Sequence, residues 1–188
     1  MIEYILIFLL FSFVGWIIDT IYSSIFVHKK FIPSGYYRNI PLCPIYGIGG
    51  IIIFQIFSKL ISYEPMIVIL VTTIFIIILE YLGGVFCIKF LKERLWDYSK
   101  RKFNLHGHID LLNSSFWLIL ITILYFIIVP NFDSIEIFLH YINEKTENYE
   151  MYITAIFMIT ILGLTIKTKD RRLQKRKKLA ETNLQHTP

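Results

Sequence analysis

Residues 79–117 read LEYLGGVFCIKFLKERLWDYSKRKFNLHGHIDLLNSSFW, and this stretch indicates what kind of protein the chain is. It begins inside an apolar run, leaves that run through a loop of aromatic and basic residues, and enters the next apolar run. Glu80 lies near the middle of the first run, with apolar residues on both sides for many positions. Because an ionisable group is costly inside a membrane, we treat Glu80 as a candidate functional residue.

The composition points to the same class of protein. Of the 188 residues, 55% are hydrophobic and 16% are aromatic, and the mean hydropathy is +0.59. Several apolar runs approach or exceed the ~20 residues that a helix needs to cross a bilayer. The sequence therefore predicts an all-α, polytopic bundle of membrane helices.

Five apolar runs are long enough to be membrane spans, and together they make a transmembrane domain over 1–166. The N-terminal run has neither a basic start nor a small-residue cleavage site, so we expect a retained span there. The remaining residues, 167–188, form a basic tail. The predicted spans cover about 2–27, 44–61, 65–91, 111–129 and 149–166.

The distribution of Lys and Arg orients these spans. Sixteen of the 19 basic residues fall in the loops 28–43 and 92–110 and in the tail, whereas the opposite side has only Lys59 and Lys145. Basic residues concentrate on the cytoplasmic side of membrane proteins. We therefore expect five spans with the N-terminus outside and the tail in the cytoplasm. The net charge of +5 is accounted for in this way, and we expect no binding to nucleic acid.

A second acid, Asp19, lies inside the first span. By the helical rise of ~1.5 Å per residue, Asp19 lies roughly 12 Å and Glu80 roughly 16 Å from the cytoplasmic ends of two parallel helices. The pair could bind a cation, relay protons or hold a basic group such as Arg38. Alternatively, each carboxylate accepts a hydrogen bond from Tyr, Trp or Ser and only fixes helix packing.

Other candidate binding residues lie near these acids or in the second large loop. Trp16 shares a helix face with Asp19, and Tyr46 is followed by glycines that allow a close approach by a ligand or another helix. In the loop, the H-x-H spacing gives only weak support for a metal site, so we expect no metal and no cofactor. A solvated or phosphate-facing loop is the favoured reading, and its candidate residues are Trp96, Asp97, Asn104 and His108.

Five sequence blocks resemble a known family. They are FSFVGWIIDTIY (11–22), PLCPIYGIGG (41–50), LEY (79–81), LWDYSKRKFNLHGHIDL (95–111) and SSFW (114–117). In this order they resemble the putative ABC-transporter type IV family, also called CmpB-like, of small bacterial multi-pass membrane proteins. The resemblance spans about residues 11–117. The family usually has glutamate where Asp19 stands and a basic residue where His108 stands, and its block before CPIYG is altered here over 34–39.

The resemblance implies a permease-like subunit that transports an unidentified solute and needs a separate ATPase. The sequence contains no G-x-x-x-x-G-K-[ST] phosphate loop, so we expect no ATP hydrolysis by this chain. One alternative is a membrane-bound enzyme that acts on lipid head groups through the loop 96–110, and another is a non-catalytic assembly or regulatory protein. The expected partners are membrane lipids, a separate nucleotide-binding subunit and further copies of the chain, in the cell membrane.

Overall fold

The computed structural model describes the backbone of residues 1–28 and 40–185, and the side chains of 1–25 and 40–174. The described residues form six α-helices: α1 (Ile2–Tyr22), α2 (Pro44–Leu60), α3 (Pro65–Phe86), α4 (Leu111–Ile128), α5 (Phe132–Thr146) and α6 (Glu150–Gln185). Single π-helical turns extend α1 and α3 at Ser23–His28 and Cys87–Leu91, and 3-10 turns at Val129–Asn131 and Glu147–Tyr149 flank α5. The strands β1 (Asn104–Leu105) and β2 (Ile109–Asp110) form one small antiparallel hairpin.

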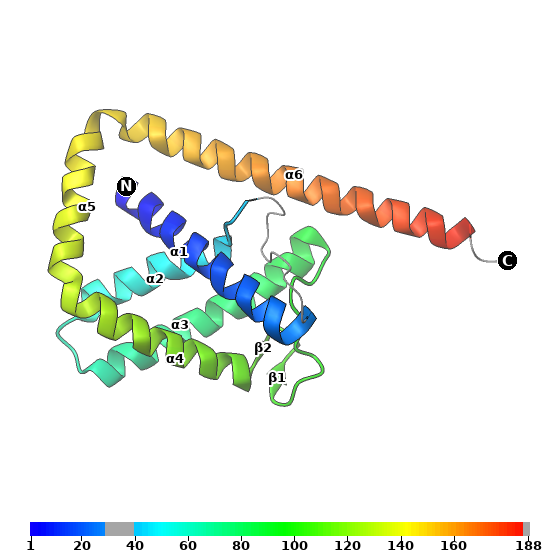
Figure 1. The fold of residues 1–188 in the computed structure, drawn as a ribbon, viewed down its shortest axis with the longest axis horizontal. Helices are drawn as coiled ribbons and strands as arrows, with labels where there is room; N and C mark the ends of the chain where they lie inside the picture. Colours follow the sequence, from blue (N-terminus) through cyan, green and yellow to red (C-terminus); the bar gives the residue numbers. More distant parts are fainter. Residues whose placement is uncertain (29–39, 186–188) are drawn as a thin grey trace.

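Helices α1 to α4 pack together as a bundle in which successive helices run in opposite directions (Figure 1). Helix α5 lies across the end of the bundle at which α1 begins, and α6 then returns along one side and extends past the bundle. At the α5 end, the amino terminus of Met1 pairs with Glu150 at 2.7 Å. Along the side, the Phe8 ring of α1 meets the Phe157 ring of α6 edge-on at 5.5 Å.

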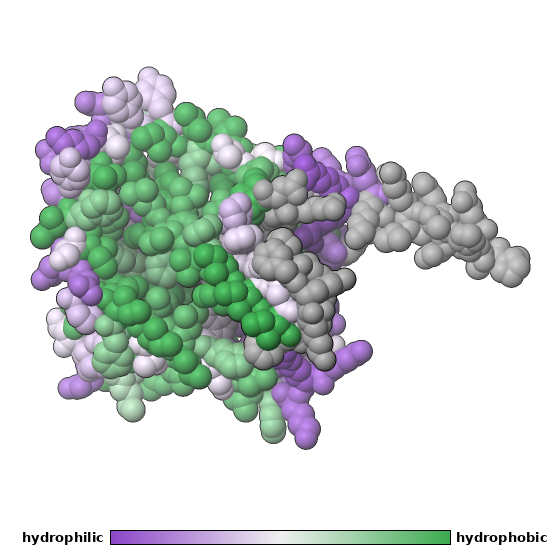
Figure 2. Space-filling model, viewed as in Figure 1, coloured by the Kyte–Doolittle hydropathy of each residue, from purple (hydrophilic) through white to green (hydrophobic). Residues whose placement is uncertain are grey.

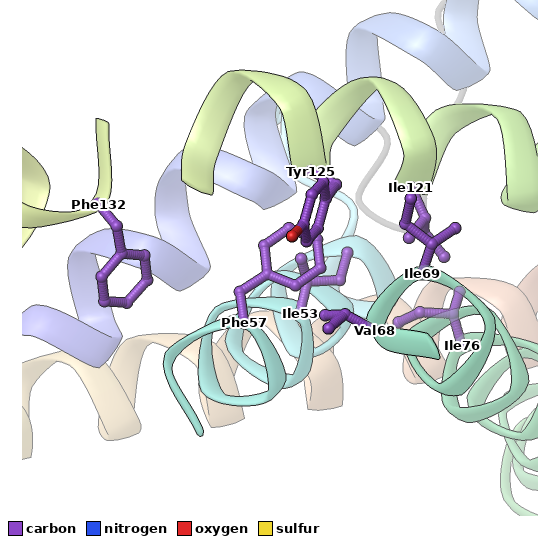
Figure 3. Close-up of a cluster of buried hydrophobic side chains, with 8 residues drawn as sticks. All are labelled: Ile53, Phe57, Val68, Ile69, Ile76, Ile121, Tyr125 and Phe132. Carbon is purple, nitrogen blue, oxygen red and sulfur yellow. The ribbon is translucent and has the colours of Figure 1, made fainter. Parts of the chain in front are cut away.

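The apolar core lies where α2, α3 and α4 meet (Figure 3). The Phe57 side chain is fully buried, and its ring packs edge-on against the Tyr125 ring at a centroid distance of 5.4 Å. Helix α4 contributes Ile121, which is also fully buried. The core cluster consists of Ile53, Phe57, Val68, Ile69, Ile76, Ile121, Tyr125 and Phe132.

Small residues bring α1 and α2 into close contact. A Cβ atom added at Gly15 would overlap the Tyr46 ring, and one added at Gly50 would overlap the Phe11 ring. Because lipid tails are as apolar as hydrophobic side chains, membrane helices gain little from the hydrophobic effect when they associate. They associate instead through close packing and hydrogen bonds. The glycines thus let Tyr46 lie directly against the backbone of α1.

The all-helical class predicted from the sequence is confirmed, and the long apolar helices are compatible with a membrane bundle. In the part of the chain that the structure describes, three helical segments are long and apolar enough to cross a membrane: Ile2–Ile25, Pro65–Leu91 and the extended Leu111–Gln174. Pro44–Leu60 is a shorter apolar helix. Figure 2 shows apolar residues over the middle of one face, with polar residues gathered toward its two ends.

Two elements differ from the sequence-based expectation. The acidic stretch after the fourth predicted span folds as the amphipathic helix α5, which buries Phe132 and Leu139 and exposes its acids. Helix α6 continues from the fifth predicted span into the predicted tail without a break at residue 166. No proline lies between 131 and 187 to stop or kink it.

Replacing Ile121 with Ala should destabilise the bundle by about 2 kcal/mol or more, because it leaves a cavity that the core cannot fill. Ile123→Ala is the matched control, since Ile123 lies on the same helix and is 51% exposed whereas Ile121 is fully buried. Unfolding of both variants in detergent measures the difference. Equal stabilities of the two variants would contradict the position of the core.

Candidate functional site

Glu80 is held by donors from two other parts of the chain. It lies on α3 with 7% of its surface exposed. The Trp117 indole Nε1 on α4 donates to Glu80 Oε2 at 2.8 Å, and the Tyr98 hydroxyl donates to Oε1 at 3.3 Å from the loop 92–110. Both carboxylate oxygens are therefore hydrogen-bonded, which offsets part of the cost of burying the group.

Asp19 has a similar arrangement between α1 and α2. The Tyr46 hydroxyl donates to Asp19 Oδ1 at 2.9 Å. The Cys43 thiol lies 3.8 Å from Oδ2, within reach of a weak S–H hydrogen bond. The Cys43 backbone N–H also donates to the Ser12 carbonyl at 2.9 Å, so the start of α2 is fixed against α1.

The two carboxylates belong to one continuous row of side chains. The Tyr46 and Trp117 rings pack against each other at a centroid distance of 5.4 Å and an angle of 43°. We call Asp19, Tyr46, Trp117 and Glu80 the acid–aromatic row. It crosses the bundle from α1 through α2 and α4 to α3.

A small cavity of about 50 Å³ lies beside this row. Its walls include the Phe11, Tyr46 and Trp117 rings, the Glu80 side chain and aliphatic residues of α1 to α4. Gly15 and Gly49 leave space on the α1 and α2 sides. The cavity is mainly apolar with one ionisable residue in its wall, as in small-molecule sites, but it is well below the roughly 300–1,000 Å³ of a pocket for a drug-sized ligand.

The loop 92–110 folds into a compact unit around its hairpin. His106 and Gly107 both have positive φ, and the His108 N–H closes the turn on the Leu105 carbonyl at 3.0 Å. Asn104 holds this unit together. Its amide nitrogen donates to the Arg101 carbonyl at 2.7 Å, and its side-chain oxygen accepts from the Gly107 N–H at 2.9 Å.

Trp96 and Asp97 also bond within the loop. Trp96 Nε1 donates to the His108 carbonyl at 2.8 Å. Asp97 Oδ1 accepts from the Ser99 N–H at 3.0 Å and from Arg94 at 3.1 Å. These bonds, led by the one from Ser99, lower the pKa of the Asp97 carboxyl, which stays ionised at neutral pH.

His108 and Arg101 dock the loop onto the helices. The buried His108 ring lies against Gly84, where an added Cβ atom would overlap the ring. Burial is the largest cause that lowers the pKa of His108, and the charge of Arg94 lowers it further. Arg101 donates to the Tyr22 hydroxyl on α1 at 2.8 Å and to Asp110 Oδ2 at 3.4 Å. The hydrogen bond with Tyr22 is the largest cause that raises the pKa of the Arg101 guanidinium. The loop thus contacts α1 and α3 and leads directly into α4.

The structure brings some of the predicted site residues together and separates others. Asp19, Tyr46 and Glu80 meet in the row, whereas Trp16 stacks on Phe13 of its own helix at 6.2 Å. The loop residues Trp96, Asp97, Asn104 and His108 make the contacts of the loop itself. Arg38 lies outside the described residues.

Two residues of the site were missed from the sequence. Trp117 and Tyr98 are the donors to Glu80, and both lie in blocks that carried the family resemblance. Among the described residues, no three His, Cys, Asp or Glu side chains gather in a way that would hold a metal ion.

Replacing Asn104 with Ala should loosen the loop while leaving the helices folded, because backbone groups at Arg101 and Gly107 lose their partner. Each unsatisfied buried group costs about 1–3 kcal/mol. Amide hydrogen exchange should therefore become faster within 94–110 and stay unchanged in α2. Lys102→Ala, at an exposed residue of the same loop, is the control, and equal exchange in both variants would show that Asn104 does not hold the loop.

Comparisons with known proteins agree with the motif blocks. A family model described as Putative ABC-transporter type IV matches residues 6–166. No curated protein and no solved structure matches the chain. The family match covers most of the chain, including every residue of the acid–aromatic row. The resemblance seen in the sequence is thereby confirmed, and the chain belongs to the putative ABC-transporter type IV family.

Proposed function

We propose that the protein is the permease-like membrane subunit of a transport system, and that the acid–aromatic row with its cavity forms its solute site. The observation that carries this proposal is the position of Glu80, which lies in the wall of a cavity inside an apolar bundle. Ionisable residues kept inside membrane domains mark substrate or ion pathways more often than they serve packing. Membership of the putative ABC-transporter type IV family also supports a role in transport.

The proposal includes five membrane spans, formed by α1 to α4 and α6, with the N-terminus outside and the C-terminus inside. These helices alternate in direction, so the end of α1, the start of α2, the loop 92–110 and the C-terminal part of α6 belong to one side. That side carries most of the Lys and Arg, as expected for the cytoplasm. Helix α5, amphipathic and with Glu136, Glu144 and Ile137 exposed, would then lie along the outer surface of the membrane.

Energy for transport would come from a separate nucleotide-binding subunit, since this sequence has no phosphate loop. The cytoplasmic surface available to such a subunit includes the loop 92–110. The basic residues at the end of α6 would meet the anionic lipids of the same leaflet.

The alternative of an enzyme acting on lipid head groups has less support from the geometry. It needs reactive side chains in the loop 96–110, but Asp97 and Asn104 bond to groups of the loop itself. His108 is buried against α3.

The proposed topology can be tested with two introduced cysteines. In intact cells, a membrane-impermeant maleimide should label Glu144→Cys on α5, and it should label Lys102→Cys only after the cells are opened. Both residues are exposed, whereas the native Cys43 and Cys87 are buried. The reverse labelling pattern, or labelling of both sites in intact cells, would refute the topology.

The transport role can be tested in the native host by comparing solute uptake with and without the gene. Wild-type protein should restore the uptake that the deletion loses, and Glu80→Gln should restore less than about a tenth of it, because the charge beside the cavity is gone. Glu144→Gln makes the same chemical change at an exposed site and should restore uptake fully.

Membrane levels of the variants must be matched by immunoblot in this experiment. If deletion changes the uptake of no compound in a broad panel of labelled solutes, the transport role is refuted. Full activity of Glu80→Gln would instead remove the row from the solute site.

A further inference from the structure

We infer that the cavity beside the acid–aromatic row binds a small alkylated ammonium group, held by the Glu80 carboxylate and the Tyr46, Trp117 and Phe11 rings. This inference rests on the proposed function, because it names the chemical class of solute for the same site. The argument uses the residues of the cavity wall, the charge around it and its size.

Aromatic rings form one part of the wall. Phe11, Tyr46 and Trp117 all line the cavity, and the last two pack together at 5.4 Å. The polar atoms of both rings point to carboxylates, since Tyr46 donates to Asp19 and Trp117 donates to Glu80. A ring that donates a hydrogen bond to an anion becomes richer in π electrons. This strengthens its attraction for a cation, an interaction best known from aromatic sites for quaternary ammonium ligands.

The ionisable side chains around the cavity are both acids. Glu80 lies in its wall, and Asp19 is linked to that wall through Tyr46. In the described part of the chain, neither carboxylate forms an ion pair, and the cavity wall contains no Lys or Arg. A carboxylate in a low-dielectric site attracts a cation far more strongly than one in water. An anionic solute would be repelled by the same two groups.

The remainder of the wall selects among cations. It consists of Gly15, Gly49 and aliphatic side chains such as Ile53 and Leu124, which cannot replace the water around a small inorganic ion. Ca²⁺ takes 6–8 oxygen ligands, and Mg²⁺ needs octahedral coordination. Here Glu80 is the carboxylate in the wall, and both of its oxygens already accept hydrogen bonds. An alkylated ammonium ion fits better because it is weakly hydrated and its methyl groups pack against apolar surface.

The size of the cavity agrees with this class. A water molecule needs roughly 10–15 Å³ of such space, so the cavity of about 50 Å³ could hold about four waters. A trimethylammonium group has four heavy atoms and tetramethylammonium has five. The cavity therefore suits the head of such a molecule, whether the molecule is a free solute or a phospholipid with a choline head group.

The test is isothermal titration of the full chain in phosphatidylglycerol nanodiscs with tetramethylammonium chloride, and with sodium chloride as the control for salt. We expect one tetramethylammonium ion per chain and no saturable heat with sodium. Nanodiscs that contain phosphatidylcholine separate the two sources of the group. A lipid ligand would weaken tetramethylammonium binding there through competition, whereas a free solute site would show unchanged affinity.

Two variants test the assignment of the site. Glu80→Gln should weaken binding by about tenfold or more, because the acidic group of the cavity wall is lost. Gly49→Ala should weaken it several-fold by reducing the cavity. It should fold normally, since the added Cβ would lie 3.4 Å from Ile76 and 3.6 Å from Leu79. The matched controls are Glu144→Gln and Gly163→Ala, of which the second adds a methyl group where no atom lies within 4 Å.

Saturable tetramethylammonium binding that both site variants weaken and both controls retain would support the inference. Absence of saturable binding in phosphatidylglycerol nanodiscs, or equal affinity in Gly49→Ala and Gly163→Ala, would overturn it. Neither result would affect the transport role, which is tested separately by the uptake of labelled solutes. Conversely, cation binding without any uptake defect in the deletion strain would retain the site and remove the transport role.

Discussion

The hydrogen bonds to Glu80 place a strict constraint on the rest of the bundle. A carboxylate on α3 must meet donors within an apolar interior, and here they come from Trp117 on α4 and Tyr98 in the loop 92–110. Inside a bilayer no bulk water could replace these donors, so their loss would leave a buried charge without a partner. The positions of α3, α4 and the loop are therefore coupled through one side chain.

The same coupling connects the loop 92–110 with the cavity. Tyr98 contacts Glu80, and the neighbouring Arg101 bonds to Tyr22 on α1 and stacks over the Tyr98 ring at 5.2 Å. A partner that displaced the loop would withdraw one donor from Glu80 and one contact from α1. Under the proposed transport function, this arrangement would connect a separate nucleotide-binding subunit physically with the proposed solute site.

The sequence indicated the membrane class and singled out Asp19 and Glu80 as candidates, because long apolar runs and an acid within them are local signals. It could not pair Glu80 with Trp117, which lies 37 residues away, since that contact depends on how α3 and α4 pack. Asp97 and Asn104 are residue types that often bind ligands, yet here they form hydrogen bonds with backbone groups of their own loop. Helix α5 was missed because its apolar residues are too few to read as a span.

The coupling between Glu80 and Trp117 can be measured directly by a double-mutant cycle with Glu80→Gln and Trp117→Phe, using unfolding of the protein in mixed detergent and SDS micelles. The indole bond to a charged oxygen should make the two changes non-additive by about 1 kcal/mol or more, with Trp117→Phe costing less once the charge is gone. Additivity within about 0.3 kcal/mol would contradict the account, because it would mean that Glu80 and Trp117 do not interact.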